Sequence, residues 1–305
     1  NVWAESGESQ EYVVVNHFMS ALDTDNDTRE QIGSVSGDDD DFNTINMDLA
    51  TDQVLGKIGK ALDMNEDSID ERVCLEVDNI TNASQCRGAN PIFDADVSVR
   101  TVSLWYKADD VNIEFPQVLF EEGGESKGQV IYLFEGKIFA CTTKSSNQAD
   151  DLVCVSSITT ANEWHHVALV WVDDGTSYLY HDGEKVATFD GADNHDHPNA
   201  SALGNIAGNT RLQMTDGSGD SEHVGYSGGA NSFDGIIDEF RVTDTVLTSA
   251  EIKTMYNSES NDDFIKRGVV LSESISFTDS ISTAAGVNLT ESIGFTDLLS
   301  YPQNL

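Results

Sequence analysis

The sequence predicts an all-β fold in which two antiparallel sheets pack as a sandwich. Strand-like runs dominate its 305 residues, and they recur about every 8–12 residues with Gly, Asn and Asp between them. In the run RTVSLWYKA, residues 100–108, apolar Val102, Leu104 and Tyr106 alternate with a second set of side chains. This is the period of a strand that places one face on a core. One large domain accounts for most of the length, since all-β sandwiches often reach about 200–250 residues.

Further strand-like runs precede and follow that segment. They are EYVVVNHFM (11–19), PQVLFEEGG (116–124), GQVIYLFEGKIFACTT (128–143) and LVCVSSI (152–158). The segment 164–189 contains three predicted strands joined by turns at 173–176 and 181–184, and the Asp-Gly of the second turn indicates a tight hairpin. The acidic stretch 20–46 shows no periodicity. It is too long for an ordinary turn, so it is either a functional or metal-ordered loop or a solvated one.

A single convincing helix follows the strands. In LTSAEIKTMYN, residues 247–257, Thr248 stands three residues before Glu251, which is the pattern of a capping box. Apolar Ile252, Met255 and Tyr256 follow at helical spacing. We therefore predict a short helix at the C-terminal end of the sandwich.

The charge balance restricts the partners of the chain. Its 54 acidic and 16 basic side chains give a formal net charge of −38, which repels phosphate backbones and anionic lipid surfaces. We expect no nucleic-acid partner and no direct insertion into a membrane. The acidity fits a surface adapted to salty water, a set of calcium sites, or both, because carboxylate oxygens are preferred Ca²⁺ ligands.

The cysteines and glycosylation sequons point to an extracellular protein. The four cysteines allow three connectivities, and we predict the two local bridges, Cys74–Cys86 and Cys141–Cys154. Sequons occur at Asn26, Asn79, Asn82, Asn199 and Asn288, and each is a glycan acceptor if the chain follows a secretory route. Paired cysteines and five sequons favour a secreted or cell-surface location. No segment has the pattern of a signal peptide or a transmembrane run, so we expect the sequence to be the mature, soluble form.

Several of these segments resemble the laminin G-like, concanavalin A-like jelly roll. The resemblance covers roughly residues 10–260 and is carried by VSLWYKA (102–108), WHHV (164–167), LYHDG (179–183), FDGIIDEFRV (233–242) and the helix after it. GKIGKALDMNEDS (56–68) is similar to an early strand of that family. The resemblance implies an antiparallel jelly-roll sandwich, a fold that hosts lectins, adhesion modules, glycosidases and inert spacers.

Four aspartates are candidate calcium ligands. Asp23, Asp25 and Asp27 alternate in a region where the family's early loop often carries calcium ligands. Asp238 lies in GIIDEFRV, where strand alternation predicts that it shares a face with Ile236, Phe240 and Val242. A buried carboxylate requires hydrogen bonds, a charge partner or a metal. The resemblance leaves two roles open for Asp238, bonding to backbone amides or helping to hold Ca²⁺, and structural calcium is the only cofactor we expect.

The histidines carry weaker signals. His165 and His166 open a predicted strand, and there we expect packing or hydrogen bonding rather than metal binding. The loop sequence DNHDHP (193–198) contains two histidines that fit adventitious binding of a transition metal.

Catalytic motifs are missing from the sequence. Glycosidases of this fold place carboxylates in an E-x-D-x-E arrangement on one strand, which the sequence lacks, and it contains neither a G-x-S-x-G elbow nor a P-loop. We therefore predict that the protein is not an enzyme.

The C-terminal residues, 264–305, contain a repeated serine-rich segment that follows the domain at 1–263. The copies at 271–282 and 289–300 each combine an apolar stripe with a row rich in hydroxyl side chains, a strand pattern. The stripes consist of Leu271, Ile275, Phe277 and Ile281, then Leu289, Ile293, Phe295 and Leu299. A lone hairpin is marginally stable in water. The tail therefore extends its own sandwich, begins a stack of repeats or adds to a neighbouring subunit, unless it is a disordered stalk. The repeat also resembles short tandem units of archaeal surface proteins.

These observations predict an extracellular, non-catalytic structural or adhesive subunit of a cell-surface or filamentous assembly, in which the tail strands dock between subunits. Its partners would be further copies of the chain or other surface proteins. The alternative is a calcium-dependent carbohydrate-binding module whose partners are glycans.

Overall fold

The computed structural model describes the main elements of the sandwich and part of the N-terminal region. The described residues are 12–16, 27–28, 42–45, 47, 49–64, 71–75, 86, 97–113, 115–123, 128–143, 152–190, 201–205, 213–214, 223–224 and 232–260. The structural statements below refer to these residues.

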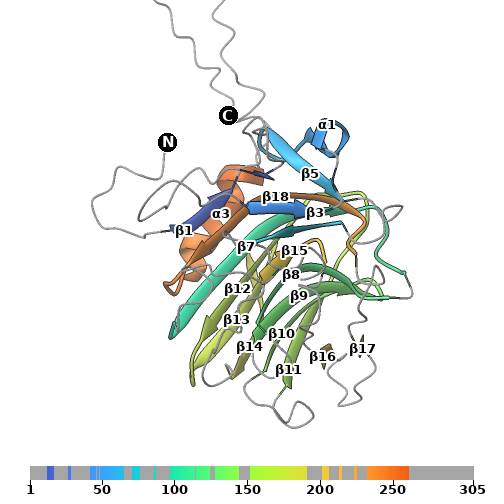
Figure 1. Cartoon of the computed structure of the whole chain (residues 1–305). Coiled ribbons are helices and arrows are strands. Elements are labelled where there is room, and N and C mark those ends of the chain that lie inside the picture. The colour runs from blue at the N-terminus through green and yellow to red at the C-terminus, as the bar shows by residue number, and fades with distance from the viewer. Residues whose placement is uncertain are drawn as a thin grey trace, which may run out of the picture. The chain divides into compact units, whose positions relative to one another are not determined.

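Two eight-stranded antiparallel sheets form the two layers of the predicted sandwich (Figure 1). The first sheet has the order β14 (Glu184–Asp190), β13 (Thr176–His181), β12 (His165–Val172), β7 (Val99–Ala108), β18 (Gly235–Thr243), β5 (Lys60–Met64) and β4 (Gln53–Leu55), and β1 (Tyr12–Asn16) also pairs with β18. The second has the order β11 (Leu152–Ile158), β10 (Lys137–Thr143), β9 (Gly128–Phe134), β8 (Gln117–Gly123), β15 (Ser201–Leu203), β6 (Arg72–Cys74), β3 (Phe42–Ile45) and β2 (Asp27–Thr28). Strands β16 (Gln213–Met214) and β17 (His223–Val224) form a separate pair.

The sequence patterns located most of these elements correctly. The predicted strands at 100–108 and 152–158 and the three strands within 164–189 are confirmed as β7, β11 and β12 to β14. The stretch 20–46 was predicted without regular structure, and that prediction was wrong in part, because β2 and β3 lie within it. Tertiary pairing produces these two strands: β2 pairs with β3, and β3 with β6, without any apolar alternation in the sequence.

The main core lies between the two sheets. Side chains of alternating strand positions, including Val102, Leu104 and Tyr106 of β7 and Ile131 and Leu133 of β9, form one buried cluster. Burial of this apolar surface is the main source of stability.

One buried ion pair also connects the layers. Arg100 of β7 pairs with Glu122 of β8, and both side chains are fully buried. Asp244 accepts a second bond from Arg100 (2.8 Å), and Gln129 donates to Glu122 (2.6 Å). Removal of one partner of such a buried ion pair is strongly destabilising. The pair therefore fixes how the two sheets meet at this end of the sandwich.

Helix α3 (Ser249–Ser260) covers the outer face of the first sheet (Figure 1). The predicted capping box is confirmed, because Thr248 N donates to Glu251 Oε2 (2.7 Å) and Glu251 N donates to Thr248 Oγ1 (3.3 Å). The helix buries an apolar face against β12 and β13, in a cluster formed by Ala168, Val170, Tyr180, Leu247, Ile252 and Met255. A second helix, α1 (Leu49–Asp52), is a single turn before β4. Within the described part of the chain, no helix has both the length and the apolar character needed to cross a membrane.

Strand β18 contains a bulge, and because of it the orientation of Asp238 differs from the predicted one. The register between β18 and β7 shifts between Asp238 and Arg241, and Glu239 has a positive φ of 53°. Ile237, Phe240 and Val242 therefore face the core, whereas Asp238 stands opposite Trp105 on the outer face. The prediction that Asp238 shares a face with Phe240 and Val242 was wrong because the alternation slips at the bulge, whereas Ile236, which precedes the bulge, does share the outer face with Asp238.

The same bulge divides the edge of β18 between two partners. Residues 235–237 pair with β5, and residues 240–243 pair with β1. Asp238 and Glu239 lie at the junction between these two pairings. The side chain of Asp238 reaches the turn before β5.

Both predicted disulfides are confirmed. Cys141 and Cys154 face each other across the β10–β11 pair, and Cys74 at the end of β6 is bonded to Cys86. The domain boundary after residue 263, the repeat copies and all eight stripe residues lie outside the described residues.

Candidate functional site

Asp238 holds the turn that precedes β5. Its Oδ2 accepts a hydrogen bond from Ile58 N (2.8 Å), and its Oδ1 accepts one from Glu239 N (2.8 Å). Gly56 packs directly against the carboxyl group, since a Cβ at this position would lie 2.3 Å from Asp238 Oδ2. Close approach of the turn to Asp238 therefore requires glycine at position 56.

The environment of Asp238 shifts its protonation. Burial raises the pKa of Asp238 to about 8, the charge of Glu239 adds to the rise, and the bonds from the backbone amides of Ile58, Glu239 and Lys57 oppose it. Both carboxyl oxygens bind backbone amides, which is the structural role left open by the sequence.

The structure does not describe the side chains of the remaining calcium candidates. Asp23 and Asp25 lie outside the described residues, and only the backbone of Asp27 is described, in β2. A calcium site formed by these aspartates stays a prediction.

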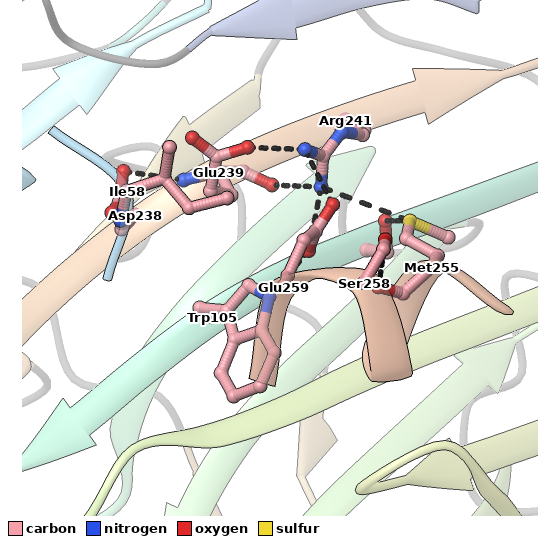
Figure 2. Close-up of polar contacts among 9 residues, drawn as sticks. Ile58, Trp105, Asp238, Glu239, Arg241, Met255, Ser258 and Glu259 are labelled. Atoms are coloured by element: carbon pink, nitrogen blue, oxygen red, sulfur yellow. Dashed lines mark hydrogen bonds and ion pairs between the residues drawn. The ribbon is translucent and has the colours of Figure 1, made fainter. Parts of the chain in front are cut away.

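A buried charge network lies beside Asp238, beneath helix α3 (Figure 2). Arg241 of β18 pairs with Glu239 of the bulge and with Glu259 of the helix, whose Oε1 lies 2.8 Å from Nη2. Trp105 Nε1 donates to Glu259 Oε2 (2.6 Å). Burial raises the pKa of Glu259, and the charge of Arg241 and the bond from Trp105 oppose that rise. These bonds attach the end of α3 to the sheet.

A second polar cluster lies where β12 begins and the β13–β14 hairpin turns. It contains His165 at the start of β12, His181 at the end of β13 and Asp182 in the turn. Asp182 and Gly183 have positive φ values of 51° and 73°, as the predicted tight hairpin requires. Asp182 Oδ2 lies 2.8 Å from His165 Nδ1 and 3.9 Å from His181 Nε2.

Asp182 carries the negative charge of this cluster. Its Oδ1 accepts a hydrogen bond from His166 N (2.9 Å), while Oδ2 faces the two imidazole rings. Burial acts to raise its pKa, but the bonds from His165 and from the amide of His166 outweigh burial, so the pKa of Asp182 is lowered. The carboxylate is ionised at neutral pH.

Hydroxyl groups contact the imidazole rings of the cluster. Thr160 Oγ1 lies 2.9 Å from His165 Nε2, and Ser157 Oγ lies 3.3 Å from His181 Nδ1. Tyr106 OH lies 3.1 Å from His181 Nε2 and 2.7 Å from Thr159 Oγ1. Burial raises the pKa of Tyr106 and lowers that of His181, so both groups are neutral at pH 7.

The neighbouring His166 belongs to the packed face under α3. Its ring contacts Trp105 edge-on, with centroids 5.3 Å apart, and lies 6.2 Å from the ring of Tyr256. Burial, followed by the charge of Arg241, lowers the pKa of His166 to about 3, so the imidazole is neutral. The predicted packing role is thus observed for His166, whereas His165 is part of the polar cluster.

Sequence reasoning missed His181 and its convergence with His165 and Asp182. The signal that was available is the Asp-Gly hairpin. In the antiparallel β12–β13 pair, Val167 stands opposite His181, which brings the start of β12 beside the turn. The five sequon asparagines lie outside the described residues, so their glycosylation stays a prediction.

Comparison of the sequence with protein families identifies one match. Residues 86–253 match the family model described as the concanavalin A-like lectin/glucanases superfamily. A comparison with curated proteins finds no match.

Solved structures with the same fold include binding domains of toxins. The binding domain of Paraclostridial Mosquitocidal Protein 1 aligns with a TM-score of 0.53 and 15% identity, over 82% of this chain and 53% of that chain. The botulinum neurotoxin serotype D binding domain aligns with a TM-score of 0.53 and 13% identity, over 82% and 51% of the two chains. The chain thus spans about half the length of the solved structures that it matches, and these likenesses show the fold alone.

Proposed function

The chain belongs to the concanavalin A-like lectin/glucanases superfamily, and on that premise we propose that it is an extracellular, non-catalytic binding module. In this proposal it serves as a structural or adhesive subunit of a cell-surface or filamentous assembly, and its C-terminal strands dock between subunits. The observation that carries the assembly role is the repeat at 271–282 and 289–300, whose two apolar stripes need a surface to cover them.

The buried carboxyl groups of β8, β18 and α3 support a binding role rather than catalysis. Glycoside hydrolysis uses two carboxyl groups that flank a substrate. Here four buried carboxyl groups are engaged within the fold: Asp238 binds backbone amides, Glu239 and Glu259 bind Arg241, and Glu122 binds Arg100. Each of these four groups is therefore occupied by a contact within the sandwich.

An extracellular location fits the covalent structure. The two disulfides constrain the sandwich where it borders the segments 76–85 and 144–151, and disulfides persist in oxidising compartments. The net charge of −38 keeps such a module soluble and repels anionic surfaces. The toxin domains that share the fold are likewise binding domains.

Removal of residues 268–305 tests the assembly role. We expect the full chain to form oligomers or filaments by light scattering and electron microscopy, and the shortened chain to stay monomeric. Unchanged assembly after removal of the tail would exclude the docking role.

A calcium-dependent carbohydrate-binding module is the second candidate, and the lectins in the superfamily favour it. Binding to a glycan array, measured with and without a chelator, separates the two candidates. Chelator-sensitive glycan binding by a monomeric protein would favour the lectin, whereas assembly without glycan binding would favour the structural subunit.

A further inference from the structure

We propose that His165, His181 and Asp182 bind a divalent transition-metal ion of the Zn²⁺ type at the β13–β14 hairpin. One ligand atom from each residue, His165 Nδ1, His181 Nε2 and Asp182 Oδ2, lies within 4.8 Å of the other two. None of these three residues belongs to the predicted calcium ligands or to the repeats of the tail.

The donor set selects the class of metal. Imidazole nitrogen is a preferred ligand of Zn²⁺, Cu²⁺ and Ni²⁺, whereas Ca²⁺ takes oxygen ligands. Two histidines and one carboxylate are a common set for Zn²⁺ sites that keep a fourth position for water. Ions that prefer oxygen ligands, such as Ca²⁺, are therefore expected to bind to the acidic surface rather than to this site.

The distances are compatible with such an ion after a small adjustment. Metal–ligand bonds of about 2.0–2.2 Å in a tetrahedron place the ligand atoms about 3.3–3.6 Å apart. The two distances to Asp182 Oδ2, 2.8 and 3.9 Å, lie on either side of that range. The remaining separation is at most 4.8 Å, so it contracts by about 1.5 Å or less when an ion binds.

The outer atoms of all three ligands are already held by hydrogen bonds. Thr160 lies at the second nitrogen of His165, and Ser157 lies at the second nitrogen of His181. The amide of His166 occupies the second oxygen of Asp182. Metal-binding histidines usually donate their other N–H to such a partner, which fixes the tautomer and aims the lone pair at the ion.

The proton balance of binding is simple. Without an ion, His165 Nδ1 and Asp182 Oδ2 are joined by a hydrogen bond of 2.8 Å. When an ion binds, His165 carries its proton on Nε2, where Thr160 Oγ1 accepts it, and His181 carries its proton on Nδ1 toward Ser157. Tyr106 OH, which lies 3.1 Å from His181 Nε2, then donates its proton to Thr159 Oγ1, so that the lone pair of Nε2 is available to the ion. The ion then takes one electron pair from each of the three ligand atoms.

Access to the site is through Asp182. Its side chain is 34% exposed, whereas those of His165 and His181 are 12% and 6% exposed. An ion can therefore enter from solvent at the turn, and a water molecule can complete the coordination on that side.

Titration of the full chain with Zn²⁺ tests the site. The protein is first stripped with a chelator and then kept in excess Mg²⁺, which occupies carboxylate-only sites, and binding is measured by calorimetry. We expect one Zn²⁺ per chain. His181→Phe and Asp182→Asn should each weaken binding by more than about 100-fold, and Thr160→Val by about 10-fold, as for an outer hydrogen-bond partner.

Asp182→Asn keeps the turn, because Asn-Gly favours the same hairpin geometry. Its circular dichroism should match that of the wild type, and Zn²⁺ should raise the unfolding midpoint of the wild type but not of this variant. The paired control is His195→Ala/His197→Ala in the loop DNHDHP, which should bind Zn²⁺ unchanged. Absence of stoichiometric binding, or binding that is lost in the loop control and kept in Asp182→Asn, would overturn the proposal.

Discussion

Asp238 Oδ2 lies 2.8 Å from the backbone nitrogen of Ile58, a residue 180 positions earlier in the chain. This hydrogen bond connects the bulge of β18 to the turn before β5, at the point where β18 changes its partner from β5 to β1. Asp238 thus fixes an internal junction of the first sheet, which explains the presence of a carboxyl group in a buried position.

At about pH 5, where Asp238 is protonated in the folded state, Asp238→Asn should destabilise the protein by about 1–3 kcal/mol, because the amide NH₂ cannot accept the bond that one carboxyl oxygen accepts. Urea unfolding, monitored by circular dichroism, measures this loss of unfolding free energy. A variant as stable as the wild type would show that the bonds to Ile58 and Glu239 contribute nothing to the junction.

The raised pKa of Asp238 gives stability a defined pH dependence. The folded state keeps a proton on Asp238 up to about pH 8, whereas the unfolded chain releases it near pH 4. The contribution of this group is therefore complete below about pH 4 and is lost as the pH rises through about 8. Between about pH 5 and about pH 9, the unfolding free energy of the wild type should fall more than that of Asp238→Asn. Parallel pH profiles of the two proteins would contradict the shift.

Arg241→Met should cost about 3–5 kcal/mol, because it leaves the buried Glu239 and Glu259 without their cation. Lys253→Met is the matched control, since the ion pair of Lys253 with Glu184 is exposed and worth less than about 1 kcal/mol. Denaturant unfolding compares the two variants. Equal losses of unfolding free energy in the two variants would mean that the buried network beneath α3 contributes no more stability than an exposed ion pair.

Replacing Cys141 and Cys154 with alanine should lower stability by about 3 kcal/mol, since the bond closes a loop over a sequence separation of 13 residues. Chemical denaturation under non-reducing conditions measures the loss. Peptide mass mapping of the wild type provides the check, and free thiols at these positions would contradict both the bridge and the oxidising location.

Local signals in the sequence predicted much of the fold. Alternation in 100–108, the Asp-Gly turn at 182–183 and the capping box of Thr248 and Glu251 each act over a few residues, and the structure confirms all three. The short spacing of the cysteines likewise predicted local bridges.

Features that depend on long-range pairing were not predictable in the same way. The bulge at Glu239 puts a non-glycine residue at positive φ and reverses the face of Asp238, which no alternation pattern reveals. The approach of His181 to His165 depends on the register of β12 and β13. The orientation of Asp238 and the approach of His181 to His165 can therefore be recognised only when the pairing of the strands is known.

The most direct test of the assembly role is the mass of the full chain in solution, measured by sedimentation velocity over a range of concentrations. The wild type should sediment as a species larger than one chain, and Phe277→Ser/Phe295→Ser, which interrupts both apolar stripes but keeps every other residue, should sediment as a monomer. A monomeric wild type, or a double variant that assembles like the wild type, would contradict the proposal that the tail joins subunits.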